Sequence, residues 1–409
     1  MTLTRDAPLS LYDGGLRTAD SPVRGIETRV LRTPAELDEI RDLWAGVPWA
    51  RPDPDIDFFH AVIDGRPEVE RPHVLLLSAD GSLVGMAVAR LETVPLECKI
   101  GYRTLYAPTV RSLTVVPGGV HGAEDPAVAA AVVDELLSAL ARREADMATL
   151  PGLLVGSPLD RAATTRPPRP FRPYARQVKP HWVAAVPDSF DDFLRARSRN
   201  TRENVKRYGK RLRGAFGDRL RIDVYGPDED VDRFLADMEK VAAGTYQRGL
   251  GTGFAATLEQ RQLIEVGVAN GWFRAWILRI DEEPRAFWYG DAYRGTFFIG
   301  SPGYDPGLAE FRPGLFLQMR MVEDLCRDPA VSAIDYGFGD AQYKRSFGDV
   351  CREEGDVRIF APSARGAWLN VAVSSSTGLD RLARRVVRRA GVTDRLKRAA
   401  RRRGAGRSS

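Results

Sequence analysis

The stretch from Tyr304 to Gly348 decides the fold and reads YDPGLAEFRPGLFLQMRMVEDLCRDPAVSAIDYGFGDAQYKRSFG. Its centre predicts a helix, because apolar residues recur at spacings of three and four after Arg312-Pro313-Gly314. Proline in a first helical turn has a fixed φ and gives up an N–H that would have no partner, and the glycine lets a ligand approach the free amides. Such a helix start is typical of an anion site. The apolar positions are Leu315, Phe316, Met319, Val322 and Leu325.

The segments on either side of this helix predict strands. Residues 285–303 alternate as an aromatic-rich hairpin, and residues 333–338 form a short apolar run. A polar and aromatic cluster, residues 339–348, follows where this last strand ends. The order hairpin, loop, helix, strand and polar cluster therefore predicts a mixed α/β module with a site at one end of its sheet.

Composition limits the class of protein. A chain of 409 residues that is 44% apolar is long enough for two domains with buried cores. It has no run of 18 apolar residues and begins with no charged-then-apolar leader, so we expect a cytoplasmic protein. Three widely spaced cysteines and four histidines match no metal spacing, and no metal cofactor is expected.

Net charge is +5, but it is unevenly distributed. Residues 379–409 hold twelve Lys and Arg against two Asp, a net charge of +10, so the residues before them carry −5. The basic character therefore comes from the C-terminal end. Bulk charge does not indicate that the folded body binds nucleic acid.

Hydrophobic periodicity predicts two modules of similar element order, each with a mixed, mostly antiparallel sheet flanked by helices. The proline-rich segment RPPRPFRP, residues 166–173, is typical of a connection between them. No residue-level repeat supports the duplication, which rests on the order of elements alone. The expected divisions are a flexible leader over 1–23, a first module over 24–175, a second over 176–365 and a basic amphipathic tail over 366–409.

Three segments carry a resemblance to a known family: the arginine-rich helix 198–207, the Tyr304-Asp305-Pro306 to Pro313-Gly314 helix start, and residues 335–348. Over about residues 180–360 the chain resembles GNAT-like acetyltransferases of the CelD/BcsL type, found beside cellulose and exopolysaccharide genes and similar to the FemAB peptidoglycan transferases. The resemblance implies α/β (α+β) tandem GNAT modules. In place of the usual GNAT phosphate loop, a basic residue or Gln followed by a glycine pair, this chain has only Arg312-Pro313-Gly314.

The resemblance implies acetyl-CoA or another acyl-CoA as the donor. Arg312 would supply charge to the pyrophosphate, and Gly314 and Leu315 would lie at the helix start. Ile299, Gly300 and Ser301 would offer backbone groups to the pantetheine arm, because GNAT folds separate two central strands there. The structural alternative is an ordinary proline-initiated helix with a surface arginine.

Four residues of the 335–348 segment are candidates for acyl transfer. Asp335 or Asp340 would act as the base, Tyr343 would protonate the departing thiolate, and Lys344 would polarise the carbonyl. The structural alternative is an Asp340–Lys344 pair four residues apart, or Asp340 as a helix cap.

The hairpin and the arginine-rich helix are candidates for acceptor binding. Aromatic and acidic hairpin residues suit sugars or peptides, although some are expected in the core. The helix 195–213 has nine Lys and Arg against Glu203, which favours an anionic ligand over a solvated face of mixed charge. The hairpin candidates are Trp288, Tyr289, Asp291 and Tyr304.

The leading hypothesis is an acyltransferase that moves an acyl group from acyl-CoA to an amine or hydroxyl of a sugar, peptide or cell-envelope precursor. One alternative is a FemAB-like aminoacyl transferase that uses charged tRNA, and another is a non-catalytic, membrane-associated scaffold. Leu379, Leu382 and Val386 at helical spacing among arginines predict peripheral contact with the inner face of an anionic membrane. A disordered basic extension that contacts RNA is the competing interpretation of this tail.

Overall fold

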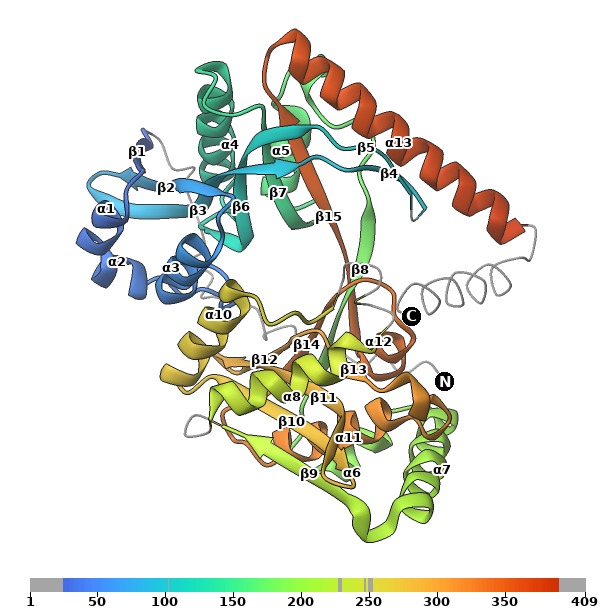
Figure 1. Ribbon diagram of the computed structural model, residues 1–409. Helices are drawn as coiled ribbons and strands as arrows, with labels where there is room; N and C mark the ends of the chain where they lie inside the picture. The colour runs from blue at the N-terminus through green and yellow to red at the C-terminus, as the bar shows by residue number, and fades with distance from the viewer. Residues whose placement is uncertain (1–24, 102, 227–229, 246–247, 249–252, 390–409) are drawn as a thin grey trace, which may run out of the picture. The chain divides into compact units, whose positions relative to one another are not determined.

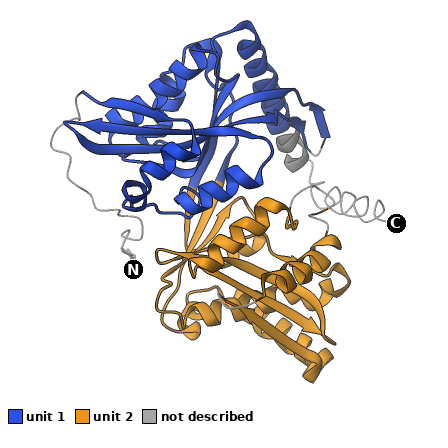
Figure 2. Cartoon of the chain, turned by 60° about the vertical axis from the view of Figure 1, so that its left-hand side comes forward, with its two compact units in different colours: residues 1–179, 353–386 blue, residues 180–352, 387–409 orange. Residues whose placement is uncertain are grey.

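The computed structural model describes residues 25–101, 103–226, 230–245, 248 and 253–389 of the chain. The described residues form two compact units. The first contains residues 25–179 and 353–386, and the second contains residues 180–352 and 387–389 (Figure 2).

The first unit is a mixed sheet with helices packed against it (Figure 1). Its strand order is β1-β2-β3-β6-β7-β15, with β6 and β7 parallel and the other neighbours antiparallel. Its elements are β1 (Glu27–Leu31), α1 (Pro34–Glu39), α2 (Arg41–Ala45), α3 (Ile56–Gly65), β2 (Val69–Ala79), β3 (Ser82–Pro95), β4 (Cys98–Ile100), β5 (Arg103–Tyr106), β6 (Thr109–His121), α4 (Pro126–Ala141), β7 (Met147–Leu154), α5 (Pro158–Thr165), η2 (Arg169–Phe171), β15 (Val350–Phe360) and α13 (Ala364–Arg389).

The second unit repeats this architecture. Its strand order is β8-β14-β12-β11-β10-β9, with β13 added to β11, and its one parallel pair among the described strands is β12 with β14. Its elements are β8 (Val178–Ala185), α6 (Phe190–Arg195), α7 (Arg199–Phe216), η3 (Gly217–Arg219), β9 (Leu220–Tyr225), α8 (Val231–Ala243), α10 (Leu258–Ala269), β10 (Phe273–Ile280), β11 (Glu283–Tyr293), β12 (Thr296–Ile299), β13 (Gly303–Tyr304), η4 (Pro306–Phe311), α11 (Pro313–Leu325), β14 (Ala333–Phe338) and α12 (Gln342–Phe347).

The two faces of the second sheet carry different cores. Helix α11 packs on one face with α6 and α7, where Trp276, Trp288 and Phe297 are buried with Leu317 and Met321. Helices α8 and α10 cover the other face. Residues i and i+2 of a strand share a face, so each strand divides its apolar side chains between the two cores.

The same order of elements occurs twice. Strand, helices, three antiparallel strands, helix, parallel strand and helix run from β1 to α5 and again from β9 to α12. The strand that completes each sheet comes from another part of the chain, because β15 pairs with β7 and β8 pairs with β14. The predicted fold class, mixed mostly antiparallel sheets flanked by helices, is confirmed.

Two features differ from the sequence expectations. The alanine-rich sequence of residues 125–147 is typical of one continuous helix, but the helix ends at Ala141, and Met147–Leu154 forms β7. The second module was predicted to end at residue 365, whereas residues 353–386 group with the first unit.

Helix α13 is packed against the first unit over the part whose side chains are described. Leu369, Asn370 and Val373 are buried, and the Asn370 amide donates to the Pro170 and Arg172 carbonyls. Farther along, an Asp380 carboxylate oxygen accepts from the Gly101 backbone N–H at 2.8 Å. The C-terminal residues 366–389, predicted as part of an amphipathic tail, are therefore helical and anchored as far as Asp380. Residues 390–409 lie outside the described residues.

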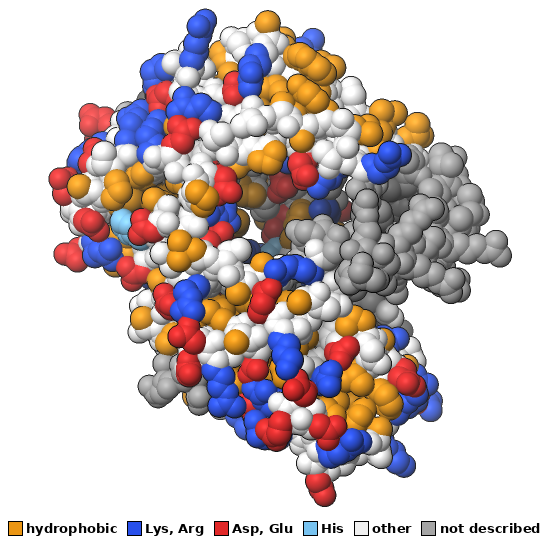
Figure 3. Space-filling view, in the orientation of Figure 1, with side chains coloured by type: hydrophobic (Ala, Val, Ile, Leu, Met, Phe, Trp, Pro, Cys, Tyr) orange, Lys and Arg blue, Asp and Glu red, His pale blue; other side chains and the backbone are white. Residues whose placement is uncertain are grey.

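Surface charge is mixed among the described residues. Figure 3 shows basic and acidic side chains interspersed over the face in view. None of the described helices combines the length and the hydropathy that a membrane span needs.

Candidate functional site

The two central strands of the second sheet part at one end. β12 and β14 are parallel neighbours as far as Phe298 and Asp335, where their recorded pairing stops. Beyond this point β14 continues against β8 through Gly337 and Phe338. The chain leaving β12 passes through Ile299, Gly300 and Ser301, of which the Gly300 N–H donates to the Tyr289 carbonyl at 2.8 Å. The end of the β12–β14 ladder thus gives backbone edges that an extended ligand with amide groups can pair with.

Helix α11 begins beside this opening. Its N-cap, Arg312, is in the left-handed region at φ 55°, and its side chain makes no capping hydrogen bond. The Leu315 and Phe316 N–H groups both donate to the Arg312 carbonyl, and Pro313 has no N–H. Within the described chain no hydrogen bond is recorded for the Gly314 N–H, so one amide of the first turn is available to an anion.

The corresponding helix of the first unit is closed to an anion. Helix α4 also starts with a proline, Pro126, but its N-cap Asp125 accepts a hydrogen bond from the Ala127 N–H at 2.6 Å. The Asp125 carboxylate occupies the N-terminal end of α4, whereas the N-cap at the N-terminal end of α11 is an arginine, Arg312. Of these two helix starts, only that of α11 therefore suits a phosphate.

Basic side chains of α7 extend this positive region. The Arg312 guanidinium lies 5.3 Å from the centre of the Tyr208 ring, and Arg207 donates to the Tyr208 hydroxyl at 3.2 Å. Desolvation raises the pKa of Tyr208, but the charges of Arg207 and Arg312 outweigh it and hold the pKa below its ordinary value. The cluster of Arg207, Tyr208 and Arg312 with the Gly314 N–H fits one phosphate group. It offers fewer amides than a glycine-rich phosphate loop would.

A buried polar pair lies where β8 meets β14. His181 Nε2 is 2.7 Å from Asp335 Oδ1, and both residues are buried. The same carboxylate oxygen accepts from the Gly337 N–H at 2.6 Å. His181 is a residue that sequence reasoning missed, because it lies 154 positions before Asp335 and no local motif marks it.

Lys344, on α12, comes close to the end of β14. Its Nζ donates to the Phe338 carbonyl at 2.9 Å. Desolvation lowers the pKa of Lys344 to about 8, while the negative charge of Asp335 opposes this shift. A substantial neutral fraction of this amine near pH 8 makes it a candidate proton acceptor.

The other acid of this cluster is differently placed. Asp340 is exposed and pairs with Arg345 at 3.2 Å, two side chains that are each about half accessible. It neither caps α12, whose N-cap is Ala341, nor pairs with Lys344. The structure thus brings Asp335 and Lys344 together and leaves Asp340 at the surface.

Aromatic rings line the α11 side of this end of the sheet. The Tyr343 ring lies 5.6 Å from Trp288 and 6.0 Å from Tyr336, edge to face in both cases. Trp288 donates its indole N–H to the Gly314 carbonyl at 2.9 Å, which fixes the first turn of α11. Tyr304 is 38% exposed, and its ring lies beside Gly314. Tyr304 and Tyr343 therefore accompany the helix start, and Trp288 supports it from the core.

The predicted grouping of the four hairpin residues is not found. Tyr289 and Asp291 alternate with Trp288 along β11 and point to the opposite face, since successive strand residues face opposite ways. The Tyr289 ring packs against Phe254 and Phe273, and burial raises its pKa. The Asp291 carboxylate lies against Gly267 of α10.

Comparison with known proteins finds a family match within the second unit. A sequence model of the acetyltransferase (GNAT) domain matches residues 199–345, which include α7, α11, β14 and Lys344. The second unit therefore carries the match to the GNAT class of transferases. No curated protein matches the sequence at the similarity required.

Three solved structures can be superposed on this chain. FemX superposes with a TM-score of 0.55 at 11% identity over 82% of this chain and 97% of its own. L-PGS from Bacillus licheniformis superposes with a TM-score of 0.46 at 14% identity, over 83% of this chain and 96% of its own. A tandem GNAT protein from the clavulanic acid biosynthesis pathway superposes with a TM-score of 0.47 at 13% identity, over 83% of this chain and 100% of its own. Of the three, only the FemX likeness reaches a TM-score of 0.5, and at this identity it shows the fold alone.

No group of three or more His, Cys, Asp or Glu side chains in the described residues is arranged to hold a metal ion. The groups described above fit an acyl-CoA at two points. The ladder end suits its amide-containing arm, and the Arg207, Tyr208 and Arg312 cluster suits one phosphate.

Proposed function

We propose that the second unit transfers an acyl group from acyl-CoA to an amine or hydroxyl of a sugar or cell-envelope precursor. The observation that carries this proposal is the parting of β12 and β14 directly beside the uncapped, Arg312-flanked start of α11. It is supported by the GNAT domain match over residues 199–345. The acceptor class rests on the resemblance to the family found beside exopolysaccharide genes.

In this proposal the donor lies along the ladder end, with a phosphate at Arg312. The acceptor nitrogen or oxygen attacks the thioester carbonyl carbon and loses a proton, and the carbon–sulfur bond breaks to release a thiolate. Lys344 in its neutral form takes the proton on Nζ, while Tyr343 gives its phenolic proton to the thiolate. The His181–Asp335 hydrogen bond joins β8 to β14, and the Asp335 charge acts on Lys344.

Two measurements test the proposal together. Acetyl-CoA at a hundredfold excess over its dissociation constant stabilises the native state by about 2.7 kcal/mol and raises the melting temperature of the full chain. Thiol release from acetyl-CoA is then followed with a panel of amino sugars, peptidoglycan peptides and hydroxylated sugars. A melting temperature that acetyl-CoA leaves unchanged contradicts the donor assignment. Binding without thiol release from any acceptor limits the second unit to a donor-binding role.

The second candidate is aminoacyl transfer from charged tRNA. It is favoured by basic side chains of α7 for which no carboxylate partner is recorded among the described residues: Lys206, Arg207, Lys210 and Arg213. RNA binding through several phosphates would weaken steeply as salt concentration rises. If tRNA binds with such a slope and acetyl-CoA does not bind, this second function replaces the first.

A further inference from the structure

A cavity of about 570 Å³ opens between α7, α11 and the start of β9 in the second unit. This volume is within the range of small-molecule sites. Its lining is polar and apolar in nearly equal measure, and the apolar part includes side chains of Val205, Leu220, Ile222, Leu315, Phe316 and Met319. The groove adjoins the proposed phosphate cluster, since Tyr208 lines it as well.

Charge is confined to specific parts of the groove. Lys206 and Arg213, seven residues apart on α7, lie on the same side of the helix and both line the cavity. The Arg213 guanidinium lies 5.2 Å from the centre of the Phe316 ring, and neither cation has a recorded carboxylate partner among the described residues. At the α11 wall, Arg320 pairs with Glu323 at 2.6 Å, so the charges there compensate. The α7 side of the groove is therefore positive.

We propose that this groove binds an anionic lipid, with a hydrocarbon chain against the apolar walls and a phosphate at Lys206 and Arg213. Charge complementarity selects this occupant. An apolar peptide or a neutral lipid would leave both cations without a partner, and a free phosphate would leave the apolar walls exposed to water. The proposal does not depend on acyl transfer, because Lys206 and Arg213 take no part in the proposed reaction, although Tyr208 of the phosphate cluster also lines the groove.

Gly209 offers a way to block the groove without disturbing the helix. It lines the cavity in the middle of α7, and a Cβ built there has only the Phe316 ring within 4 Å, at 3.9 Å. The Gly209→Ala substitution adds a small methyl group and favours the helix. The Gly209→Leu substitution favours the helix as well, but its side chain occupies the space that a lipid chain would take.

The test is a calorimetric titration of the full chain with lysophosphatidic acid below its micellar concentration. Glycerol phosphate supplies the head group without the chain, and lysophosphatidylcholine supplies the same chain with a zwitterionic head. We expect binding at one site per chain, weakened at least tenfold by Gly209→Leu and unchanged by Gly209→Ala. Glycerol phosphate and lysophosphatidylcholine should each bind at least tenfold more weakly.

Charge variants complete the test. The double variant Lys206→Gln/Arg213→Gln should bind lysophosphatidic acid at least tenfold more weakly than wild type. Lys210→Gln, on the same helix but outside the cavity wall, should bind it as tightly as wild type. Melting temperatures establish that the variants are folded. Equal affinity of wild type, Gly209→Leu and the double variant places the lipid elsewhere and overturns the proposal. Equal affinity for the two lysolipids overturns the anionic part of it.

Discussion

His181 Nε2 and Asp335 Oδ1 lie 2.7 Å apart on neighbouring antiparallel strands, and both side chains are buried. Asp340, five residues beyond Asp335, is exposed and pairs only with Arg345 among its recorded ion pairs in the described chain. The two aspartates therefore allow one chemical change to be compared in a buried and an exposed setting.

The Asp335→Asn substitution should lower the free energy of unfolding by about 1–3 kcal/mol, because it replaces the charged acceptor for His181 and the Gly337 N–H in a buried site. Asp340→Asn should change it by less than about 0.5 kcal/mol. Urea denaturation of the two variants measures both values. If Asp335→Asn lowers the free energy of unfolding no more than Asp340→Asn does, the buried pair does not hold β8 to β14.

Lys344 should give acyl transfer a pH dependence. Its pKa is lowered to about 8, so the neutral amine predominates above pH 8 and is lost as the pH falls below it. We expect kcat/KM with a verified acceptor to rise through pH 8, and Lys344→Met to lose this rise. Tyr343→Phe should lower turnover while the rise with pH remains. If the Lys344→Met variant retains the wild-type profile, Lys344 is not the proton acceptor.

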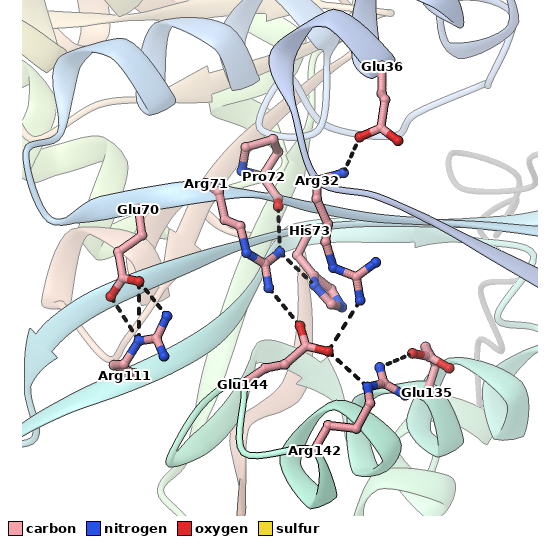
Figure 4. Close-up of polar contacts among 10 residues, drawn as sticks. All are labelled: Arg32, Glu36, Glu70, Arg71, Pro72, His73, Arg111, Glu135, Arg142 and Glu144. Atoms are coloured by element: carbon pink, nitrogen blue, oxygen red, sulfur yellow. Dashed lines mark hydrogen bonds and ion pairs between the residues drawn. The ribbon is translucent and has the colours of Figure 1, made fainter.

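His73 should make the first unit sensitive to acid. Figure 4 shows its ring beside Arg71, whose guanidinium lies 3.2 Å from Nδ1, while Arg32, Arg71 and Arg142 all bond to Glu144. Burial lowers the pKa of His73 to about 4, with a further contribution from Arg71, so the folded state disfavours the protonated ring.

The unfolded chain therefore binds a proton near pH 6.5 that the folded chain does not bind until about pH 4. The contribution of His73 to the free energy of unfolding is complete above pH 6.5. It decreases by roughly 1.4 kcal/mol per pH unit as the pH falls from 6.5 to about 4. His73→Gln should lack this part of the slope. Denaturant titrations at pH 7.5, 6 and 5 compare the two proteins, and identical slopes would contradict the account.

Two deletions at the C-terminal end should have different effects, because one removes only the basic end of the chain and the other also removes an anchoring contact. Deleting residues 390–409, which hold seven Lys and Arg against one Asp, should leave the melting temperature unchanged and weaken sedimentation with anionic vesicles. Deletion of residues 379–409 removes Asp380 as well. It should lower the free energy of unfolding by about 1–3 kcal/mol, because the Gly101 N–H loses its acceptor. Undiminished vesicle binding by the shorter deletion would place any membrane contact elsewhere.

Elements with strong local signals were predictable from the sequence. Thr33 followed three residues later by Glu36 is the spacing of a capping box, and Arg312-Pro313-Gly314 predicts a helix start; the structure has a helix at both places. Strand β7 was missed because Pro151 and Gly152 interrupt its pattern, and Gly152 lies at a positive φ beside a register shift. Its pairing with β15 joins residues about two hundred positions apart, which no local pattern reveals.

The candidate site was predictable only in part. Arg312, Gly314 and Lys344 lie in one continuous motif, so sequence order alone brought them together. His181 and Tyr208 join them through β8 and α7, which are far away in the chain. The opposite orientations of Trp288 and Tyr289 follow from strand alternation.

The central claim is that an acyl-CoA phosphate binds at Arg312. Calorimetric titration of acetyl-CoA into wild type, Arg312→Ala and Arg327→Ala tests it most directly, since Arg327 lies just past the opposite end of the same helix and is 62% exposed. Arg312→Ala should weaken binding by about 1.5–3 kcal/mol, the range for a hydrogen bond to a charged group, and Arg327→Ala should leave it unchanged. Equal affinities for all three proteins, or no binding to wild type, would contradict the account.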